Sequence, residues 1–262
     1  MNNDREPSRN AIGFALPLLI VALVWQLVVS IGLVDSSLVP SPWSIGRTML
    51  GLLSPEPLIL SYLVTSLYRM VVGFVLGSVI GILLGVPLGA SGGLHKALKP
   101  ILDFFISVPT ICWVPLLLIS VGMGDATVII AVFLGCVFPV TYSAMNGVRS
   151  TRKDLVWAAR GMGASSSRVL FAVLLPAALP SVITGLRLAV GYSWRALVGA
   201  EMLAAASSGI GYMIYAARAF YDVNVMFAGL VLIALAGLGM DYLVMGTLER
   251  RTIQKWGAVT KT

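Results

Sequence analysis

The sequence predicts an all-α integral membrane protein with six transmembrane helices. Hydrophobic residues make up 58% of the chain and charged residues 11%, whereas roughly a quarter of the residues in a soluble domain are charged. The mean hydropathy is +0.94. The apolar residues fall in long runs, and most basic residues lie in the segments between alternate runs. Together, these observations predict the fold class, the number of crossings and the orientation.

Each apolar run is long enough to cross a bilayer, which takes roughly 18–20 residues of helix. The fifth run, Val169–Ala206, has only Arg187, Arg195 and Glu201 as charged residues, and the sixth, Val223–Leu248, has only Asp241. A continuous apolar helix of this length is typical of a membrane span. The six predicted spans are Ala11–Val34, Val71–Leu94, Phe104–Gly124, Ala126–Val148, Val169–Ala206 and Val223–Leu248.

The placement of basic residues predicts the orientation, because cytoplasmic loops carry an excess of Lys and Arg. A cytoplasmic N-terminus puts residues 1–10, 150–168 and 249–262 in the cytoplasm, together with most of the basic residues. The outer side then keeps Arg47 and Arg218, with Arg69 at the mouth of the second span. This asymmetry explains the net charge of +7, so the sequence indicates a lipid-bilayer protein that binds no nucleic acid.

Sequence signatures of catalysis and of ion coupling are absent from the chain. It has no G-x-x-x-x-G-K-[ST] phosphate-binding loop, and His95 is the only histidine. The predicted spans hold too few ionisable residues for a proton or ion relay. The sequence therefore predicts a transport subunit that is not an enzyme and has no catalytic residue, metal site or cofactor of its own. A secondary transporter or channel is the alternative from another class.

A polar segment, Ser150–Arg168, separates two apolar regions and is predicted to contain a short cytoplasmic helix of two to three turns. Thr151 and Asp154 fit a capping box, in which a hydroxyl and an acid satisfy free backbone N–H groups. One apolar stripe follows at helical spacing. Its members are Leu155, Ala158, Ala159 and Met162.

Stop and restart signals follow this predicted helix. Gly161 and Gly163 favour its end, and Ser165–Ser167 offer caps for the next helix. One interpretation is a helix that docks on a soluble partner. The other is an amphipathic helix lying among anionic lipid headgroups. The small residues of its apolar stripe favour close contact with a protein.

The same segment resembles the cytoplasmic signature of permease subunits of bacterial ATP-binding-cassette importers. That signature is Glu-Ala-Ala, three residues, Gly, nine residues and Ile-x-Leu-Pro. This chain has Trp157-Ala158-Ala159, Gly163 and Val173-Leu174-Leu175-Pro176 at the same spacing, with Trp157 in place of the acid. The resemblance implies a coupling helix that fits a groove of the ATPase. The residues it implies for ATPase coupling are Leu155, Trp157, Ala158, Ala159, Met162, Gly163 and Pro176.

Further segments are similar to the nitrate/sulfonate/taurine branch of these permeases. They are Leu38–Thr48, Val108–Thr127, Leu179–Trp194 and Leu197–Ile214. The resemblance implies a single permease domain over residues 1–262 with the MetI-like fold of type I importers. It also implies a homodimer in a bacterial inner membrane, two ATPase subunits that bind ATP and Mg, and an extracytoplasmic substrate-binding protein. The implied substrate is a small anion such as a sulfonate, taurine, nitrate or bicarbonate. A neutral or aromatic molecule, such as a pyrimidine precursor of thiamine, is the alternative.

Arg187, Arg195 and Glu201 are the candidate residues of the substrate pathway. Arg187 has an alternative structural interpretation, because near a membrane surface it can snorkel or pair with a neighbouring helix. A lone Arg195 deep in a span costs on the order of 2.5–3.5 kcal/mol, so it is expected to line a cavity or find a partner. Five glycines at every fourth position of the second span predict close packing against an unidentified helix. They are Gly73, Gly77, Gly81, Gly85 and Gly89.

Overall fold

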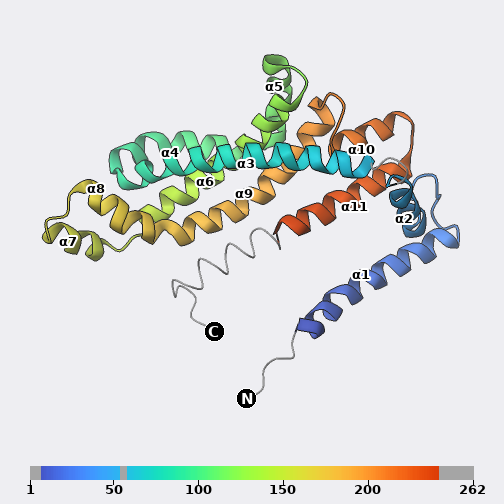
Figure 1. Ribbon diagram of the computed structural model, residues 1–262, viewed down its shortest axis with the longest axis horizontal. Helices are drawn as coiled ribbons and strands as arrows, with labels where there is room; N and C mark the ends of the chain where they lie inside the picture. The colour runs from blue at the N-terminus through green and yellow to red at the C-terminus, as the bar shows by residue number, and fades with distance from the viewer. Residues whose placement is uncertain (1–6, 54–57, 242–262) are drawn as a thin grey trace.

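The computed structural model describes residues 7–53 and 58–241, and all of the regular structure within these ranges is helical (Figure 1). This confirms the all-α prediction. The predicted cytoplasmic segment 249–262 and the first six residues lie outside the described ranges. The helices are α1 (Pro7–Ser30), α2 (Pro42–Gly51), α3 (Leu58–Ala90), α4 (Gly92–Ser107), η1 (Thr110–Trp113), α5 (Val114–Val121), α6 (Asp125–Arg149), α7 (Lys153–Gly161), α8 (Ser166–Val169), η2 (Leu170–Leu174), α9 (Leu175–Ala204), α10 (Ile210–Ala219) and α11 (Val223–Gly239).

Three helices are individually long and apolar enough to span a membrane: α3, α6 and the continuous helix Ser166–Ala204 formed by α8, η2 and α9. The pair α4 and η1–α5 passes the same test only jointly, with a bend of 91° between its parts. The apolar stretches Leu16–Ser30 of α1 and Val223–Gly239 of α11 lie in the first and last of the six predicted spans. The structure therefore has a helix at every predicted span, and within residues 7–53 and 58–241 three of these helices are unbroken spans of full length.

The prediction of one continuous span over Phe104–Gly124 is wrong. Helix α4 ends at Ser107, and Val108 is extended, with φ −83° and ψ 118°. Pro109 explains the break, because proline disfavours the helical conformation in the residue before it. The boundary of the second span also differs, since α3 begins at Leu58 and carries Arg69 well inside the helix.

The glycines of α3 pack directly against α6 of the same chain. A β-carbon at Gly73 would lie 2.7 Å from the Val132 β-carbon, and one at Gly89 would lie 2.6 Å from the Val148 β-carbon. The contacts advance together along both helices, so α3 and α6 run parallel. The partner of the glycine row is therefore a helix of this protomer. The two ends of α3 lie near opposite ends of the bundle (Figure 1).

Gly85→Ala is expected to destabilise the fold by about 1–3 kcal/mol, the usual cost of overpacking a tight contact. Its β-carbon would lie 2.5 Å from the Thr141 carbonyl oxygen, a backbone atom that cannot rotate away. The measurement is the thermal unfolding midpoint of the purified chain in detergent. Gly46→Ala is the matched control, because Gly46 is helical with open space around it. Equal midpoints for the two variants would contradict the close packing of α3 on α6.

Helix α9 packs on α6 in the antiparallel direction, with Gly135 beside Ser193 and Gly147 beside Ala178. Parallel α3 and antiparallel α9 thus enclose α6, which holds the longest series of buried residues in the described chain. Helices α7 and α8 project at one end of this bundle, and α2 and α10 lie towards the other (Figure 1). The polar segment and the buried charges of the membrane helices consequently occupy different ends.

Candidate functional site

The predicted cytoplasmic helix is present as α7, but its start differs from the prediction. The capping box is wrong: Arg152 occupies the N-cap position, and no side chain caps the helix there. The Thr151 hydroxyl instead donates to the Gly147 carbonyl at 3.4 Å. Asp154 is held by Arg152, whose Nη2 lies 2.5 Å from the carboxylate Oδ2. That hydrogen bond is the main reason that the pKa of Asp154 lies below its usual value, and the backbone N–H groups of Asp154 and Leu155 lower it further.

The end of α7 confirms the predicted stop. Gly163 has φ 81°, a left-handed conformation that glycine adopts without steric cost. Its N–H donates to the Arg160 carbonyl at 2.9 Å, and the Ala164 N–H donates to the Ala159 carbonyl at 3.0 Å. This is the hydrogen-bonding pattern of a glycine-terminated helix. Ser165 then caps α8 by accepting from the Arg168 N–H at 3.4 Å, as the sequence predicted.

The apolar stripe of α7 divides between two environments. Ala159 is buried against the chain, whereas Ala158 is exposed. Leu155 is about half exposed, Trp157 is 67% exposed and Met162 is 83% exposed. A contiguous group of exposed apolar side chains is typical of a surface that a partner or a membrane covers. The free face of α7 can therefore bury considerable apolar area against a partner.

Pro176 lies in the first turn of α9, directly after the π-helical turn η2. Proline has no N–H to donate, and in a regular α-helix its ring clashes with the carbonyl four residues earlier. A π-helical turn is wider, and such turns are frequent at functional positions. The polar segment thus enters the continuous helix Ser166–Ala204 through a local irregularity that Pro176 accompanies.

The membrane helices contain a buried ion-pair network that the sequence analysis missed. Arg69 of α3 is 2% exposed and Glu201 of α9 is 1% exposed, and Arg69 Nη1 lies 2.8 Å from Glu201 Oε1. Arg69 Nη2 also lies 2.6 Å from Asp125 Oδ1, at the start of α6. Asp125 is the first residue of α6 and its side chain is 57% exposed, so the position of Arg69 at the mouth of a span stays a prediction. The sequence signal for this network is Glu201 itself, because a charged residue deep in an apolar run needs a partner.

Further hydrogen bonds complete the shell of Glu201. The Ser66 hydroxyl lies 2.8 and 2.9 Å from the two carboxylate oxygens, and the Gly211 N–H donates to Oε2 at 2.9 Å. Arg69 Nη1 also donates to the Ser208 carbonyl at 2.7 Å. The network joins α3, α6 and α9 to the segment around α10. A pathway role for Glu201 stays a prediction, and its contacts here are those of a structural anchor.

The structure does not bring the three pathway candidates together. Arg187 lies 3.3 Å from Asp241 after α11, which is the neighbouring-helix pairing offered as its structural interpretation. Arg195 is exposed on α9, and its guanidinium carbon lies 6.0 Å from the centroid of the Tyr192 ring. No ion pair to Arg195 occurs within residues 7–53 and 58–241. In the same ranges, no group of three or more His, Cys, Asp or Glu residues is arranged to hold a metal ion.

Comparisons with known proteins identify the family. Residues 77–254 match the model of the binding-protein-dependent transport system inner membrane component. The chain is 32% identical to the taurine transport system permease protein TauC of Escherichia coli, over 92% of this chain and 89% of that protein. It is 35% identical to the putative aliphatic sulfonates transport permease protein SsuC of Bacillus subtilis, over 93% and 87% of the two chains.

A third relative is the bicarbonate transport system permease protein CmpB of Synechocystis, with 30% identity over 84% of this chain and 81% of that one. Among solved structures, the inward-facing MetNI methionine ABC transporter gives a TM-score of 0.65 at 22% identity. That match covers 76% of this chain and 99% of the other. It supports the MetI-like fold of the prediction. This chain therefore belongs to the family of binding-protein-dependent transport system inner membrane components, the permease subunits of ATP-binding-cassette importers.

Proposed function

We propose that this permease imports a small anion of the sulfonate, taurine, nitrate or bicarbonate type. The printed functions of its relatives support this choice, since TauC, SsuC and CmpB are permeases for taurine, aliphatic sulfonates and bicarbonate. Membership of the family implies an ATPase and a substrate-binding protein as partners. In the proposed assembly, two copies of this chain form a homodimer beside two ATPase subunits, which bind ATP and Mg.

The exposed face of α7 is the observation that carries the proposed coupling mechanism. Leu155, Trp157, Ala158 and Met162 stand free on a helix that projects from the end of the bundle (Figure 1). In the proposal this face fits a groove of the ATPase, with Ala159, Gly163 and Pro176 shaping the helix and its exit. ATP binding draws two such helices together, and the membrane helices switch between inward-open and outward-open states as packed units.

The proposed topology puts α7 and both termini in the cytoplasm of a cell with an inner membrane. Basic residues support it, since Arg149, Arg152, Lys153, Arg160 and Arg168 all gather around α7 and α8. Maleimide labelling of single cysteines from outside intact cells tests this topology. With Cys112 and Cys136 replaced by serine, Ser167→Cys is expected to stay unlabelled and Ser37→Cys is expected to react. The reverse pattern would invert the orientation.

Reconstitution tests the function as a whole. The chain is placed in proteoliposomes with its ATPase and binding protein, and uptake of labelled taurine, an alkanesulfonate, bicarbonate and a neutral pyrimidine is measured. We expect ATP-dependent, saturable uptake of one of the anions. Uptake that proceeds without ATP or ATPase would indicate a secondary transporter or channel. Uptake of the pyrimidine alone would replace the anionic substrate with the neutral alternative.

Arg195→Ala is expected to raise the KM for the anion by about tenfold, the contribution of one hydrogen bond to a charged group. The proposal gives Arg195 this role because it is exposed and held beside the Tyr192 ring without an acidic partner in the described chain. Arg195→Lys should retain most of the affinity. Arg218→Ala is the matched control, since Arg218 lies 5.8 Å from the Tyr215 ring on α10. Unchanged affinity and rate in Arg195→Ala would remove this residue from the pathway.

A further inference from the structure

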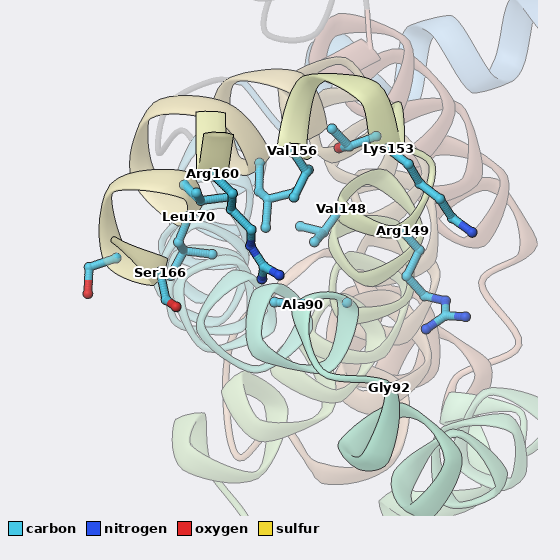
Figure 2. Close-up of a pocket in the computed structure, with 14 residues that line it drawn as sticks. Ala90, Gly92, Val148, Arg149, Lys153, Val156, Arg160, Ser166 and Leu170 are labelled. Carbon is cyan, nitrogen blue, oxygen red and sulfur yellow. The ribbon is translucent and has the colours of Figure 1, made fainter. Parts of the chain in front are cut away.

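A cavity of about 630 Å³ lies beside α7, which lines it with Lys153, Val156 and Arg160. Its walls come from the turn between α3 and α4, the end of α6, α7 itself and the start of the helix Ser166–Ala204. Figure 2 shows Arg160 extending towards Ala90, whereas Arg149 and Lys153 lie on the opposite side and extend away from Arg160. The volume falls within the roughly 300–1,000 Å³ of small-molecule sites, so the cavity is large enough for a ligand.

The polar part of the lining is cationic and lacks an opposing acid. Arg149, Lys153 and Arg160 all contribute, and none of them forms an ion pair with any residue of the described chain. None of the fourteen lining residues is acidic. The nearest acid in sequence, Asp154, is engaged by Arg152. Hydroxyl donors complete the polar wall: Thr151, Ser166 and Ser167.

The remaining wall is apolar. Val148 ends the buried row of α6, and Leu170 and Leu174 belong to the π-helical turn η2. These residues close the cavity where it meets the membrane helices. A ligand that fits both walls carries a phosphate for the cations and hydroxyls, joined to a glycerol or another less polar part. Arginine forks and hydroxyl groups suit phosphate oxygens, which accept several hydrogen bonds at once.

We propose that this cavity binds a phosphate group, either the headgroup of an anionic phospholipid or a soluble phosphate compound. Both sources present the same chemistry to Arg149, Lys153 and Arg160. An occupant would also connect α7 to the turn after α3 and to the end of α6. In the described chain α7 otherwise packs mainly on α8 and η2. The site is thus placed to steady α7, and its binding does not depend on which solute the permease imports.

The test uses the full-length chain purified with its ATPase in nanodiscs. In the first arm, the discs contain phosphatidylglycerol and phosphatidylcholine, and native mass spectrometry measures which lipid stays bound. In the second arm, the discs contain phosphatidylcholine alone, and calorimetry measures binding of inorganic phosphate and glycerol 3-phosphate. The triple variant Arg149→Gln/Lys153→Gln/Arg160→Gln is expected to weaken binding at least tenfold, since each lost charged hydrogen bond supplies about that factor.

The matched control is Lys96→Gln/Arg152→Gln/Arg168→Gln, which removes the same charge from the same end of the bundle without touching the cavity lining. A second variant, Ala90→Trp, keeps every charge and fills the space. Binding lost in the lining variants in the first arm identifies a lipid headgroup, and loss in the second identifies a soluble phosphate. Equal binding by lining and control variants would overturn the site. Loss of the ATPase from the lining variant with phosphate binding intact would also overturn it, because the cavity would then receive a protein side chain.

Discussion

Glu201→Ala is expected to lower the stability of the chain by about 3–5 kcal/mol, the typical cost of leaving one partner of a buried ion pair uncompensated. Arg69 would keep its contact with Asp125, but Nη1 would lose the carboxylate at 2.8 Å. The Ser66 hydroxyl and the Gly211 N–H would lose their acceptor in the same buried space. The measurement is the thermal unfolding midpoint in detergent, which should fall by on the order of 10 °C.

Two further variants separate the charge from the space it occupies. Glu201→Gln retains an acceptor for Ser66 and Gly211, so a smaller loss is expected. Replacing both charges, with Arg69→Met and Glu201→Leu together, should recover part of the loss, because apolar residues of similar volume can substitute for a buried pair. The exposed pair of Arg152 and Asp154 supplies the surface control, and Asp154→Ala should leave the midpoint nearly unchanged. A wild-type midpoint in Glu201→Ala would refute the anchoring role of the network.

Gly163→Leu is expected to uncouple ATP hydrolysis from transport. The residue closes α7 in a left-handed conformation, and a β-carbon added there would meet no heavy atom of the described chain within 4 Å. The fold should therefore persist, with a local strain of roughly 1–2 kcal/mol. The new side chain would enter open space directly after α7. The measurement is the ratio of solute imported to ATP hydrolysed, which should fall about tenfold while hydrolysis continues.

Gly161→Leu is the matched comparison, because Gly161 lies in α7 with equally open surroundings and without a positive φ. Gly163→Asn addresses the backbone, since asparagine tolerates the left-handed region better than other residues with a β-carbon. Trp157→Glu restores the acid of the family signature and should support transport. A Gly163→Leu variant that transports with the wild-type ratio would argue against docking through this end of α7.

The sequence predicted best those features that local signals determine. The end of α7 at Gly163 and the cap at Ser165 depend on residues a few positions apart, and the structure confirms both. The start of α7 was wrong because the pattern of Thr151 and Asp154 took no account of Arg152, whose guanidinium binds the acid. The break at Val108 was also a local consequence of Pro109, but a long apolar run obscured it.

Contacts between segments that are far apart in the sequence were harder to predict. Arg69 and Glu201 are 132 positions apart in the sequence. In a hydropathy profile each is an isolated charged residue in an apolar segment, so the profile does not pair them. The row of glycines on α3 predicted close packing without identifying α6 as its partner, because the spacing records only one of the two surfaces. The substrate-pathway roles of Arg187 and Arg195 are the hardest to predict from sequence, because they depend on the subunits that surround these residues in the assembly.

The contact between α3 and α6 also limits which substitutions evolution can accept at the glycines of α3. Every codon change that replaces a glycine adds at least one side-chain carbon, and at Gly73, Gly77, Gly81, Gly85 and Gly89 that carbon would fall within 2.5–2.9 Å of a neighbouring heavy atom. These positions therefore lack the conservative replacements that leucine and valine have among one another. At Gly73, Gly81, Gly85 and Gly89 one of the atoms in the way is a backbone carbonyl oxygen of α6, which no side-chain change on α6 removes. These positions are therefore expected to stay glycine while the exposed faces of both helices vary.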